Sequence, residues 1–336
     1  MVELKEAILY NRSQDNKVSC YLCNHHCLIS DGQFGICGVR QNIKGKLFTH
    51  VYGRLVAANI DHIEKKPIFH MLPGSYSYSI ATVGCNFHCA FCQNWQISQA
   101  KEASGQETFE MTPAEVVRRA KAYDCPSISY TYTEPTVYFE FAYDVMQFAK
   151  EQNLYNIFVT NGYMSAECLE VAKDYLDAAN VDLKSFSEDF YKKICGGRLA
   201  PVLDSIILMR KLNIWVEITT LVIPTLNDSA RELEKIAKFI ADLDKGIPWH
   251  ISRFYPAYKM LDLESTSLKK LNEAYRIGKE AGLRYVYIGN VAQEENTYCY
   301  NCNELLIRRF GFSVLENKLR DAKCPKCNSK IDGLAL

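Results

Sequence analysis

Residues 84–93 read GCNFHCAFCQ and follow directly after a strand-like apolar run. Cys85, Cys89 and Cys92 lie within eight positions here, and the next cysteine along the chain is Cys125. Three thiolates in one short loop can hold three corners of an iron–sulfur cluster, and such a cluster leaves one iron open for a ligand. The alternative is a structural zinc loop, but zinc normally takes a fourth ligand from another loop. The stretch therefore favours a catalytic iron–sulfur site.

Length and charge narrow the class of protein. At 336 residues the chain exceeds one comfortable core, so we expect one large domain with small appendages. Acidic and basic residues number 39 each, which gives no electrostatic reason to expect a nucleic-acid or membrane partner. No run approaches the roughly 18 apolar residues of a membrane span, and the first residues lack a secretion-signal pattern. We therefore predict a cytoplasmic protein.

The fourteen cysteines are clustered. Three tight groups contain three, four and four of them, and the remaining Cys125, Cys168 and Cys195 are most simply small interior or turn residues. In a reducing compartment such grouping indicates metal binding rather than disulfide bonds.

Strand-like and helical patterns alternate strictly through the middle of the chain. The strand-like runs cover residues 78–83, 128–132, 157–160, 180–183, 215–222, 249–254 and 284–288. The helical patterns cover residues 112–122, 136–152, 165–178, 199–212, 229–243 and 266–282. This alternation predicts an α/β fold with a parallel sheet, either a TIM-like barrel or a doubly wound sheet. In both, ligands gather at the carboxyl ends of the strands, where the three-cysteine loop lies.

The cysteine spacing, three residues and then two with an aromatic residue before the last cysteine, resembles the signature of radical SAM enzymes. In that family the open iron chelates S-adenosylmethionine (SAM), and reductive cleavage releases a 5′-deoxyadenosyl radical that abstracts hydrogen from the substrate. The resemblance implies a [4Fe-4S] cluster on Cys85, Cys89 and Cys92, with SAM as cofactor. It also favours a partial TIM-like (βα)6 radical SAM barrel.

A carboxylate follows the second strand. Glu134-Pro135 stands where many radical SAM enzymes carry Gly-Gly-Glu-Pro, but Tyr132 and Thr133 replace the two glycines. The resemblance implies that Glu134 pairs with the ammonium group of SAM. The alternative is a solvated charge at a helix N-terminus.

Further candidates end the later strands. Thr160 and Asn161 resemble a Thr-Asn-Gly turn of activating-enzyme relatives, or form only a tight turn. Asp182 and Lys184 share one side of their strand and serve the active site or pair with each other. His250 faces the cofactor, or is a hydrogen-bonded interior residue.

The two outer cysteine groups each have four thiols. Cys299, Cys302, Cys324 and Cys327 form two knuckles typical of a structural zinc ribbon, with a rubredoxin-like iron as the alternative.

At the other end, the unequal spacing of Cys20, Cys23, Cys27 and Cys37 fits zinc or an auxiliary iron–sulfur cluster. We thus predict an N-terminal cysteine-rich metal-binding segment over 1–74, a radical SAM barrel over 75–292 and a zinc-ribbon-like segment over 293–336.

The flanks carry a closer resemblance, to the radical SAM component of the AmmeMemoRadiSam system, related to pyruvate formate-lyase activating enzyme. The matching stretches are CLISDGQFGICGVR (27–40), VYGRLVAANIDHIEKKPIFHMLPG (51–74), ATVGCNFHCAFCQNWQIS (81–98), ENTYCYNCNELL (295–306) and GFSVLENKL (311–319). The resemblance implies AMMECR-type and Memo-type partners, an electron donor and an unidentified substrate. Without it, the charged segment 63–67 would be taken for a linker. The alternatives are an activating enzyme for a glycyl-radical enzyme and a non-catalytic metal-binding scaffold.

Overall fold

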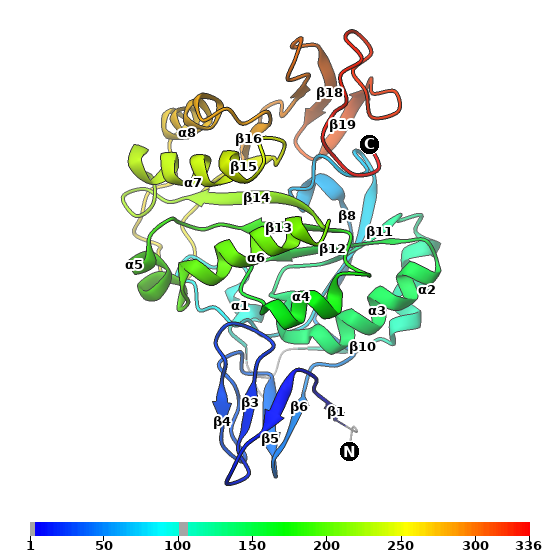
Figure 1. Cartoon of the computed structure of the whole chain (residues 1–336), viewed down its shortest axis with the longest axis vertical. Helices are drawn as coiled ribbons and strands as arrows, with labels where there is room; N and C mark the ends of the chain where they lie inside the picture. The colour runs from blue at the N-terminus through cyan, green and yellow to red at the C-terminus, as the bar shows by residue number, and fades with distance from the viewer. Residues whose placement is uncertain (1–3, 101–106) are drawn as a thin grey trace.

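An eight-stranded sheet forms the centre of the protein (Figure 1). The computed structural model describes residues 4–100 and 107–336. The strands are β8 (Ala57–His62), β9 (Tyr76–Ala81), β11 (Ser127–Tyr130), β12 (Tyr155–Thr160), β13 (Ala178–Asp182), β14 (Trp215–Val222), β15 (Trp249–Arg253) and β16 (Val286–Gly289). Strands β9 and β11 to β16 run parallel, and β8 pairs antiparallel with β9 at one edge.

Helices connect the parallel strands and pack along the sheet (Figure 1). They are α2 (Pro113–Ala122), the 3₁₀ turn η2 (Pro135–Tyr138) with α3 (Phe139–Glu151), α4 (Ala166–Ala172), α6 (Leu199–Lys211), α7 (Ala230–Leu243) and α8 (Leu268–Glu280). Four of them begin at a hydroxyl side chain that accepts the backbone N–H three residues on, which satisfies one open donor of the first turn. These N-caps are Thr112, Ser165, Ser229 and Ser267.

The strand order distinguishes a TIM-like barrel from a doubly wound sheet, which the sequence pattern could not do. Neighbouring parallel strands follow one another in chain order, from β9 to β16. A doubly wound sheet would reverse direction at a switch point, whereas a barrel keeps the order sequential. The six strand–helix units and the mostly parallel sheet therefore agree with the predicted partial barrel.

Helix limits differ from prediction in three places. The pattern over 165–178 ends as a helix at Ala172, because Ala178 already begins β13. The pattern over 136–152 begins with the 3₁₀ turn η2 rather than with α-helix. A short helix α5 (Glu188–Phe190) and a π-helical turn η3 (Tyr191–Cys195) precede α6 without having been predicted.

Strand β8 lies before the predicted boundary at residue 74, yet it belongs to the central sheet. The segment that follows it, with the 3₁₀ turn η1 (Ile63–Lys65), is also packed on the barrel. Ile63, Ile68 and Met71 are fully buried against strand residues such as Ile157 and Trp215. The 57–74 stretch thus covers part of the barrel.

The N-terminal segment is a pair of small sheets at one end of the molecule (Figure 1). One contains β1 (Lys5–Glu6), β6 (Lys46–Thr49) and β5 (Arg40–Ile43), and the other contains β2 (Tyr10–Arg12), β3 (Val18–Cys20) and β4 (Leu28–Ile29). Strand β7 (Arg54–Leu55) pairs with β10 (Phe109–Glu110), and α1 (Trp95–Ser98) follows the cysteine loop. A buried ion pair between Arg40 and Glu140 of α3 joins this segment to the barrel.

The C-terminal segment is a three-stranded sheet at the opposite end (Figure 1). Its strands are β17 (Thr297–Tyr298), β18 (Leu305–Phe310) and β19 (Ser313–Asn317). Arg309 is fully buried and lies 3.4 Å from Glu64, so a second buried Arg–Glu pair joins this segment to the barrel.

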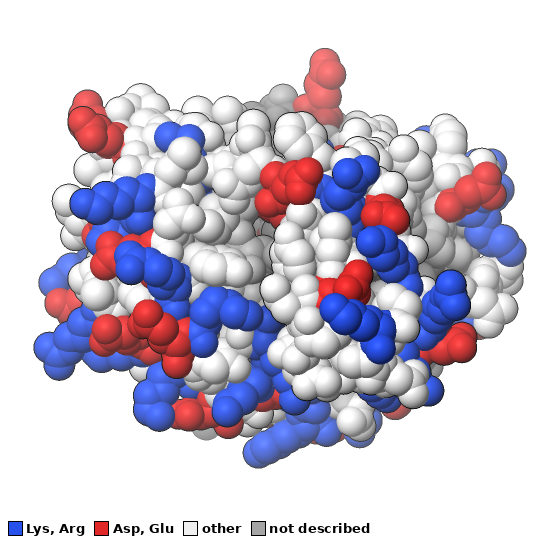
Figure 2. Space-filling view, turned by 90° about the horizontal axis from the view of Figure 1, so that it is seen from above, with Lys and Arg blue, Asp and Glu red and all other residues white. Residues whose placement is uncertain are grey.

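The face at this C-terminal end carries basic and acidic side chains intermixed (Figure 2). In the part of the chain that the structure describes, no helix has the length and apolar character that crossing a bilayer requires.

Candidate active site

One large cavity opens at the carboxyl ends of the strands, and its empty space, counted together with its open mouth, is about 1570 Å³. All three cysteines of the loop after β9 line it. Five further predicted residues line the same cavity: Glu134, Thr160, Asn161, Asp182 and Lys184. The structure thus brings together predicted residues from three strand ends, those of β11, β12 and β13, and from the loop after β9, although their binding roles stay predictions.

Close packing and backbone hydrogen bonds fix the position of the cysteine loop. Gly84 has φ +98°, and a Cβ there would lie 2.6 Å from Cγ1 of Val39, so only glycine fits without a shift. The N–H of His88 donates to the carbonyl of Cys195 at 2.8 Å. These contacts fix the loop between the N-terminal segment and the turn η3.

Polar groups approach two of the three sulfurs. The N–H of Phe87 lies 3.3 Å from Sγ of Cys85, and Nδ2 of Asn161 lies 3.8 Å from the same sulfur. Oγ of Ser98 lies 3.2 Å from Sγ of Cys92. Such donors stabilise negative charge on sulfur, as ligand thiolates of a cluster require.

Cys195 is buried, in agreement with its prediction as an interior residue. Its thiol lies beside that of Cys89, and this interaction holds the pKa of Cys89 below its usual range. The sequence contains no signal for this contact, because the two residues come from separate loops.

Glu134 is buried and already has several donors. Its Oε1 accepts the N–H of Thr136 at 3.1 Å and the hydroxyls of Thr136 at 2.5 Å and Thr160 at 2.8 Å. Its Oε2 accepts only the N–H of Asn161, at 2.8 Å, among the contacts of the described chain. Burial raises the pKa of this carboxyl, while the hydrogen bonds act in the opposite direction. Oε2 therefore retains a lone pair that can accept from a ligand ammonium.

Tyr132 has the positive φ angle that usually requires glycine, although it carries a large side chain. Its φ is +63°, and the N–H of Thr133 donates to the carbonyl of Thr131 at 2.7 Å, which makes a γ-turn centred on Tyr132. Positive φ costs a non-glycine residue about 1–2 kcal/mol. The Tyr132 hydroxyl donates to Asp61, and Nδ2 of Asn94 donates to the Tyr132 carbonyl at 2.9 Å. These tertiary contacts offset the strain.

Asp182 and Lys184 pair with each other at 2.7 Å, as one of the two predicted alternatives has it. Burial alone would lower the pKa of Lys184, but Asp182 and the nearby thiols of Cys89 and Cys195 raise it. Lys184 therefore stays a cation beside the cysteine loop.

The predicted placement of His250 at the cofactor is corrected by the structure. His250 is absent from the described lining of the cavity. Its Nε2 lies 2.7 Å from Oε2 of Glu217, and its ring stacks on Tyr287 with centroids 5.2 Å apart. Glu217 also accepts the N–H groups of Phe69 at 3.0 Å and His70 at 2.8 Å. His250 is thus part of a buried polar network in the barrel floor, which is the interior alternative.

Two lysines that the residues alone assigned to a linker line the cavity instead. Lys65 and Lys66 both pair with Asp61, at 2.7 and 2.5 Å, and Nζ of Lys66 lies 4.5 Å above the ring of Tyr132. Burial lowers the pKa of Lys66 to about 8. Two lysines with one aspartate leave this wall of the cavity with a net positive charge at neutral pH. In the sequence, the signal for this placement was the pair of apolar residues on either side of the lysines, Ile63 and Ile68, both of which are buried in the structure.

The C-terminal cysteines converge as predicted. Their four Sγ atoms lie within 4.8 Å of one another, and the Cys299–Cys327 and Cys302–Cys324 pairs are 3.5 and 3.6 Å apart. Four thiolates around one ion at about 2.3 Å require sulfur separations near these values. The set fits one tetrahedral metal ion.

The chain is similar to several known proteins. The sequence matches the Radical SAM superfamily over residues 79–240. The uncharacterized protein MJ0808 of Methanocaldococcus jannaschii is 45% identical over 334 residues, which cover 98% of this chain and 99% of that protein. A pyruvate formate-lyase-activating enzyme of Clostridium pasteurianum is 25% identical, over 59% of this chain and 87% of its own length. Streptococcus suis SuiB aligns with a TM-score of 0.49 and 15% identity, over 68% of this chain and 52% of that chain.

A mostly parallel α/β sheet with three cysteines of one loop at its carboxyl edge defines an iron–sulfur enzyme of the SAM-cleaving kind. The chain belongs to the radical SAM superfamily and is related to pyruvate formate-lyase-activating enzymes. That family implies a [4Fe-4S] cluster and SAM.

The residues present fit this cofactor pair. In the described chain, Cys85, Cys89 and Cys92 are not among the side chains that converge within 4.8 Å on a single ion, although they line one cavity. Three thiols of one loop that do not converge on a single ion suit a multi-iron cluster, and the cavity has room for an organic cofactor.

Proposed function

We propose that this protein cleaves SAM reductively and uses the 5′-deoxyadenosyl radical to abstract hydrogen from an unidentified substrate. The observation that carries the proposal is the single cavity that the three loop cysteines share with Glu134, Thr160 and Asn161. Cys85, Cys89 and Cys92 would hold the cluster, which when bound supplies the electron for the cleavage.

Other residues of the cavity would orient SAM. Glu134 would accept the ammonium group through Oε2, because Oε1 is occupied by Thr136 and Thr160. Thr160 and Asn161 fix that carboxylate, and Asn161 also approaches the sulfur of Cys85. One turn thus positions both the cluster and the amino end of SAM. Lys65 and Lys66, which also line the cavity, favour a substrate with an anionic group.

We further propose that the enzyme acts in the cytoplasm within a three-protein system, with AMMECR-type and Memo-type partners and an electron donor. The support is the resemblance of residues 27–40, 51–74 and 295–319 to the radical SAM component of that system. Co-purification of the tagged chain with such partners would support it, and their absence from the complex under anaerobic conditions would oppose it.

A second candidate function is the activation of a glycyl-radical enzyme. The relation to pyruvate formate-lyase-activating enzymes favours it. The two functions differ in the hydrogen donor. Deuterium transfer from a small molecule into 5′-deoxyadenosine supports the first function, whereas a glycyl-radical electron paramagnetic resonance (EPR) signal in a partner protein supports the second.

The test is anaerobic reconstitution with iron and sulfide, followed by incubation with SAM and dithionite and measurement of 5′-deoxyadenosine. We expect wild-type protein to form it and Cys89→Ala to form none. Cys125→Ala is the matched control, because Cys125 is equally buried but lies away from the cavity lining. Equal 5′-deoxyadenosine formation by Cys89→Ala would contradict the proposal.

A further inference from the structure

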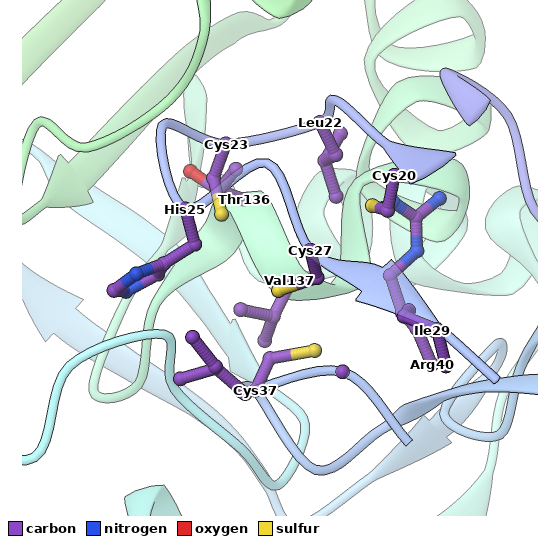
Figure 3. Close-up of a pocket in the computed structure, with 12 residues that line it drawn as sticks. Cys20, Leu22, Cys23, His25, Cys27, Ile29, Cys37, Arg40, Thr136 and Val137 are labelled. Carbon is purple, nitrogen blue, oxygen red and sulfur yellow. The ribbon is translucent and has the colours of Figure 1, made fainter. Parts of the chain in front are cut away.

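The four N-terminal cysteines line one cavity, whose empty space, counted together with its opening to solvent, is about 340 Å³. Figure 3 shows Cys23, Cys27 and Cys37 directed toward the space between them, with Cys20 at one side next to the guanidinium of Arg40. Nη1 of Arg40 lies 3.1 Å from Sγ of Cys20. The site therefore has four thiols and a buried cation facing it.

The spacing of these thiols differs from that of the C-terminal set. In the described chain, the C-terminal cysteines are the group whose ligand atoms converge within 4.8 Å, and no three of the N-terminal cysteines do so. One zinc ion at about 2.3 Å from each sulfur needs that convergence. The N-terminal thiols behave like those of Cys85, Cys89 and Cys92, which also surround a cavity without converging. A cluster of several irons holds its thiolates farther apart than one ion does.

Gly35 and residues of the barrel form the wall of this cavity. A Cβ at Gly35 would lie 3.2 Å from Cδ1 of Ile29 and 3.8 Å from the sulfurs of Cys27 and Cys37. Val137 of η2 lines the other side, so the barrel itself completes the wall. The lining is mostly apolar apart from the thiols, the imidazole of His25, the hydroxyl of Thr136 and Arg40. Such a lining shields an iron–sulfur cluster from solvent.

The site is also next to the catalytic loop. The side chain of Asn86, the residue after Cys85, acts on the thiol of Cys23, and its Nδ2 is buried without a hydrogen-bond partner in the described chain. Oδ1 of Asn86 accepts from Nδ2 of Asn161 at 2.7 Å, and the same amide lies 3.8 Å from Sγ of Cys85. His25 lies with Nε2 2.7 Å from the carbonyl of Asn86. Through His25, Asn86 and Asn161, polar contacts thus join the lining of the N-terminal cavity to the sulfur of Cys85.

We propose that Cys20, Cys23, Cys27 and Cys37 ligate an auxiliary iron–sulfur cluster that passes one electron to the catalytic cluster. Four thiolates leave no iron open, so the cluster suits electron transfer rather than substrate binding. It would take one electron from a low-potential one-electron donor and deliver it past Asn86, with no bond made or broken. The electron-transfer role depends on the proposed function, whereas the ligation does not.

The decisive protein is the full chain with Cys85, Cys89 and Cys92 all changed to alanine. After anaerobic reconstitution, we expect roughly two to four irons with equal sulfide, an EPR signal on reduction and about one zinc. A protein with about two zinc ions and no iron would overturn the proposal. Circular dichroism compared with wild type checks that the chain has folded.

Two matched variants separate the sites. Cys302→Ala with Cys327→Ala should lose the zinc and keep all of the iron, whereas Cys20→Ala with Cys27→Ala should lose the auxiliary iron and keep the zinc. The second variant should still cleave SAM with dithionite, and should do so at least tenfold more slowly with a ferredoxin-type donor. An undiminished rate with that donor would overturn the electron-transfer role. If the auxiliary iron is present but wild-type protein fails to cleave SAM, the proposed function fails and the ligation stands.

Discussion

The two ends of this molecule each carry four cysteines but hold them differently. At the C-terminal end, two paired knuckles bring the four sulfurs within 4.8 Å of one another. At the N-terminal end, the four thiols stand around a cavity of about 340 Å³. The number and type of ligands are the same, so the backbone that carries them decides which metal group fits.

The two ends also differ in their cores. Val18, Ile29 and Val39 of the N-terminal segment belong to the same hydrophobic cluster as the barrel interior. Leu306 and Ile331 of the C-terminal segment belong to a second, smaller cluster, which also contains Phe69, Tyr285 and Tyr287 of the barrel. The comparison indicates that the N-terminal end packs into the main core, whereas the C-terminal end packs on the barrel through a second cluster.

The largest effect should follow removal of the C-terminal metal. Cys302→Ala with Cys327→Ala deletes two of four ligands, and structural zinc binding is worth about 10–16 kcal/mol in short zinc-binding peptides. We expect residues 293–336 to become open to limited proteolysis while the barrel stays protected. Loss of protection in the barrel as well would show that the two clusters are not independent.

The two buried Arg–Glu pairs offer a matched test of the attachments. Arg309→Met leaves Glu64 buried without its cation, and Arg40→Met does the same to Glu140. Each change should lower the free energy of unfolding by about 3–5 kcal/mol, measured by urea denaturation. Only Arg40→Met should also reduce the iron content, because Arg40 contacts Cys20. Equal iron loss in both variants would contradict the distinction.

Acid should weaken the C-terminal attachment through His70. Its ring nitrogens face the carbonyl of Asp332 and the hydroxyl of Tyr287, and burial lowers its pKa from 6.5 to about 4. As the pH falls, His70 therefore takes up a proton in the unfolded chain before it does so in the folded protein. The contribution of His70 to the free energy of unfolding is fully present above pH 6.5 and is lost as the pH falls toward 4.

The expected loss is roughly 3 kcal/mol over that window. His70→Gln should unfold with a flatter pH dependence than wild type when both are measured from pH 7 to pH 4.5. Changes common to both proteins, such as metal release, cancel in the difference. Parallel pH profiles would show that another group is responsible.

The smallest effects should come from two glycines. Gly311→Ala has free space around the new methyl group but a φ of +56°, so it should cost about 1 kcal/mol and leave metal content unchanged. Gly35→Ala places its methyl group against Ile29 and two sulfurs, so it should lower iron content with a comparable or smaller loss of stability. Metal analysis beside thermal denaturation distinguishes them, and intact iron in Gly35→Ala would argue against a filled cavity there.

Local patterns predicted most of the barrel. Apolar runs and amphipathic helices depend on residues close in sequence, so strand and helix positions followed from them, and strand β14 has the predicted limits. The cysteine loop and Glu134 were found for the same reason. The reach of the fold into residues 57–74 was missed, because β8 gains its place only by pairing with β9.

The sequence also did not predict how deep within the barrel each strand residue lies. Two-residue alternation predicts which face of a strand a side chain occupies, but not how far along the strand the cavity ends. His250 and Ser252 share a face, yet Ser252 lines the cavity and His250 lies beneath it with Glu217. Lys66 was missed for a related reason, since its packing over the ring of Tyr132 depends on a residue far away in the sequence.

The order in which the chain is made gives the two ends different histories. The wall of the N-terminal cavity includes Val137, which follows Cys37 by 100 residues, so the enclosure does not exist until the ribosome has made η2. The C-terminal knuckles lie within 29 residues of each other, from Cys299 to Cys327, and can capture their ion as soon as they emerge. The N-terminal site therefore has to wait for a distant part of the barrel, whereas the C-terminal site depends only on its own segment.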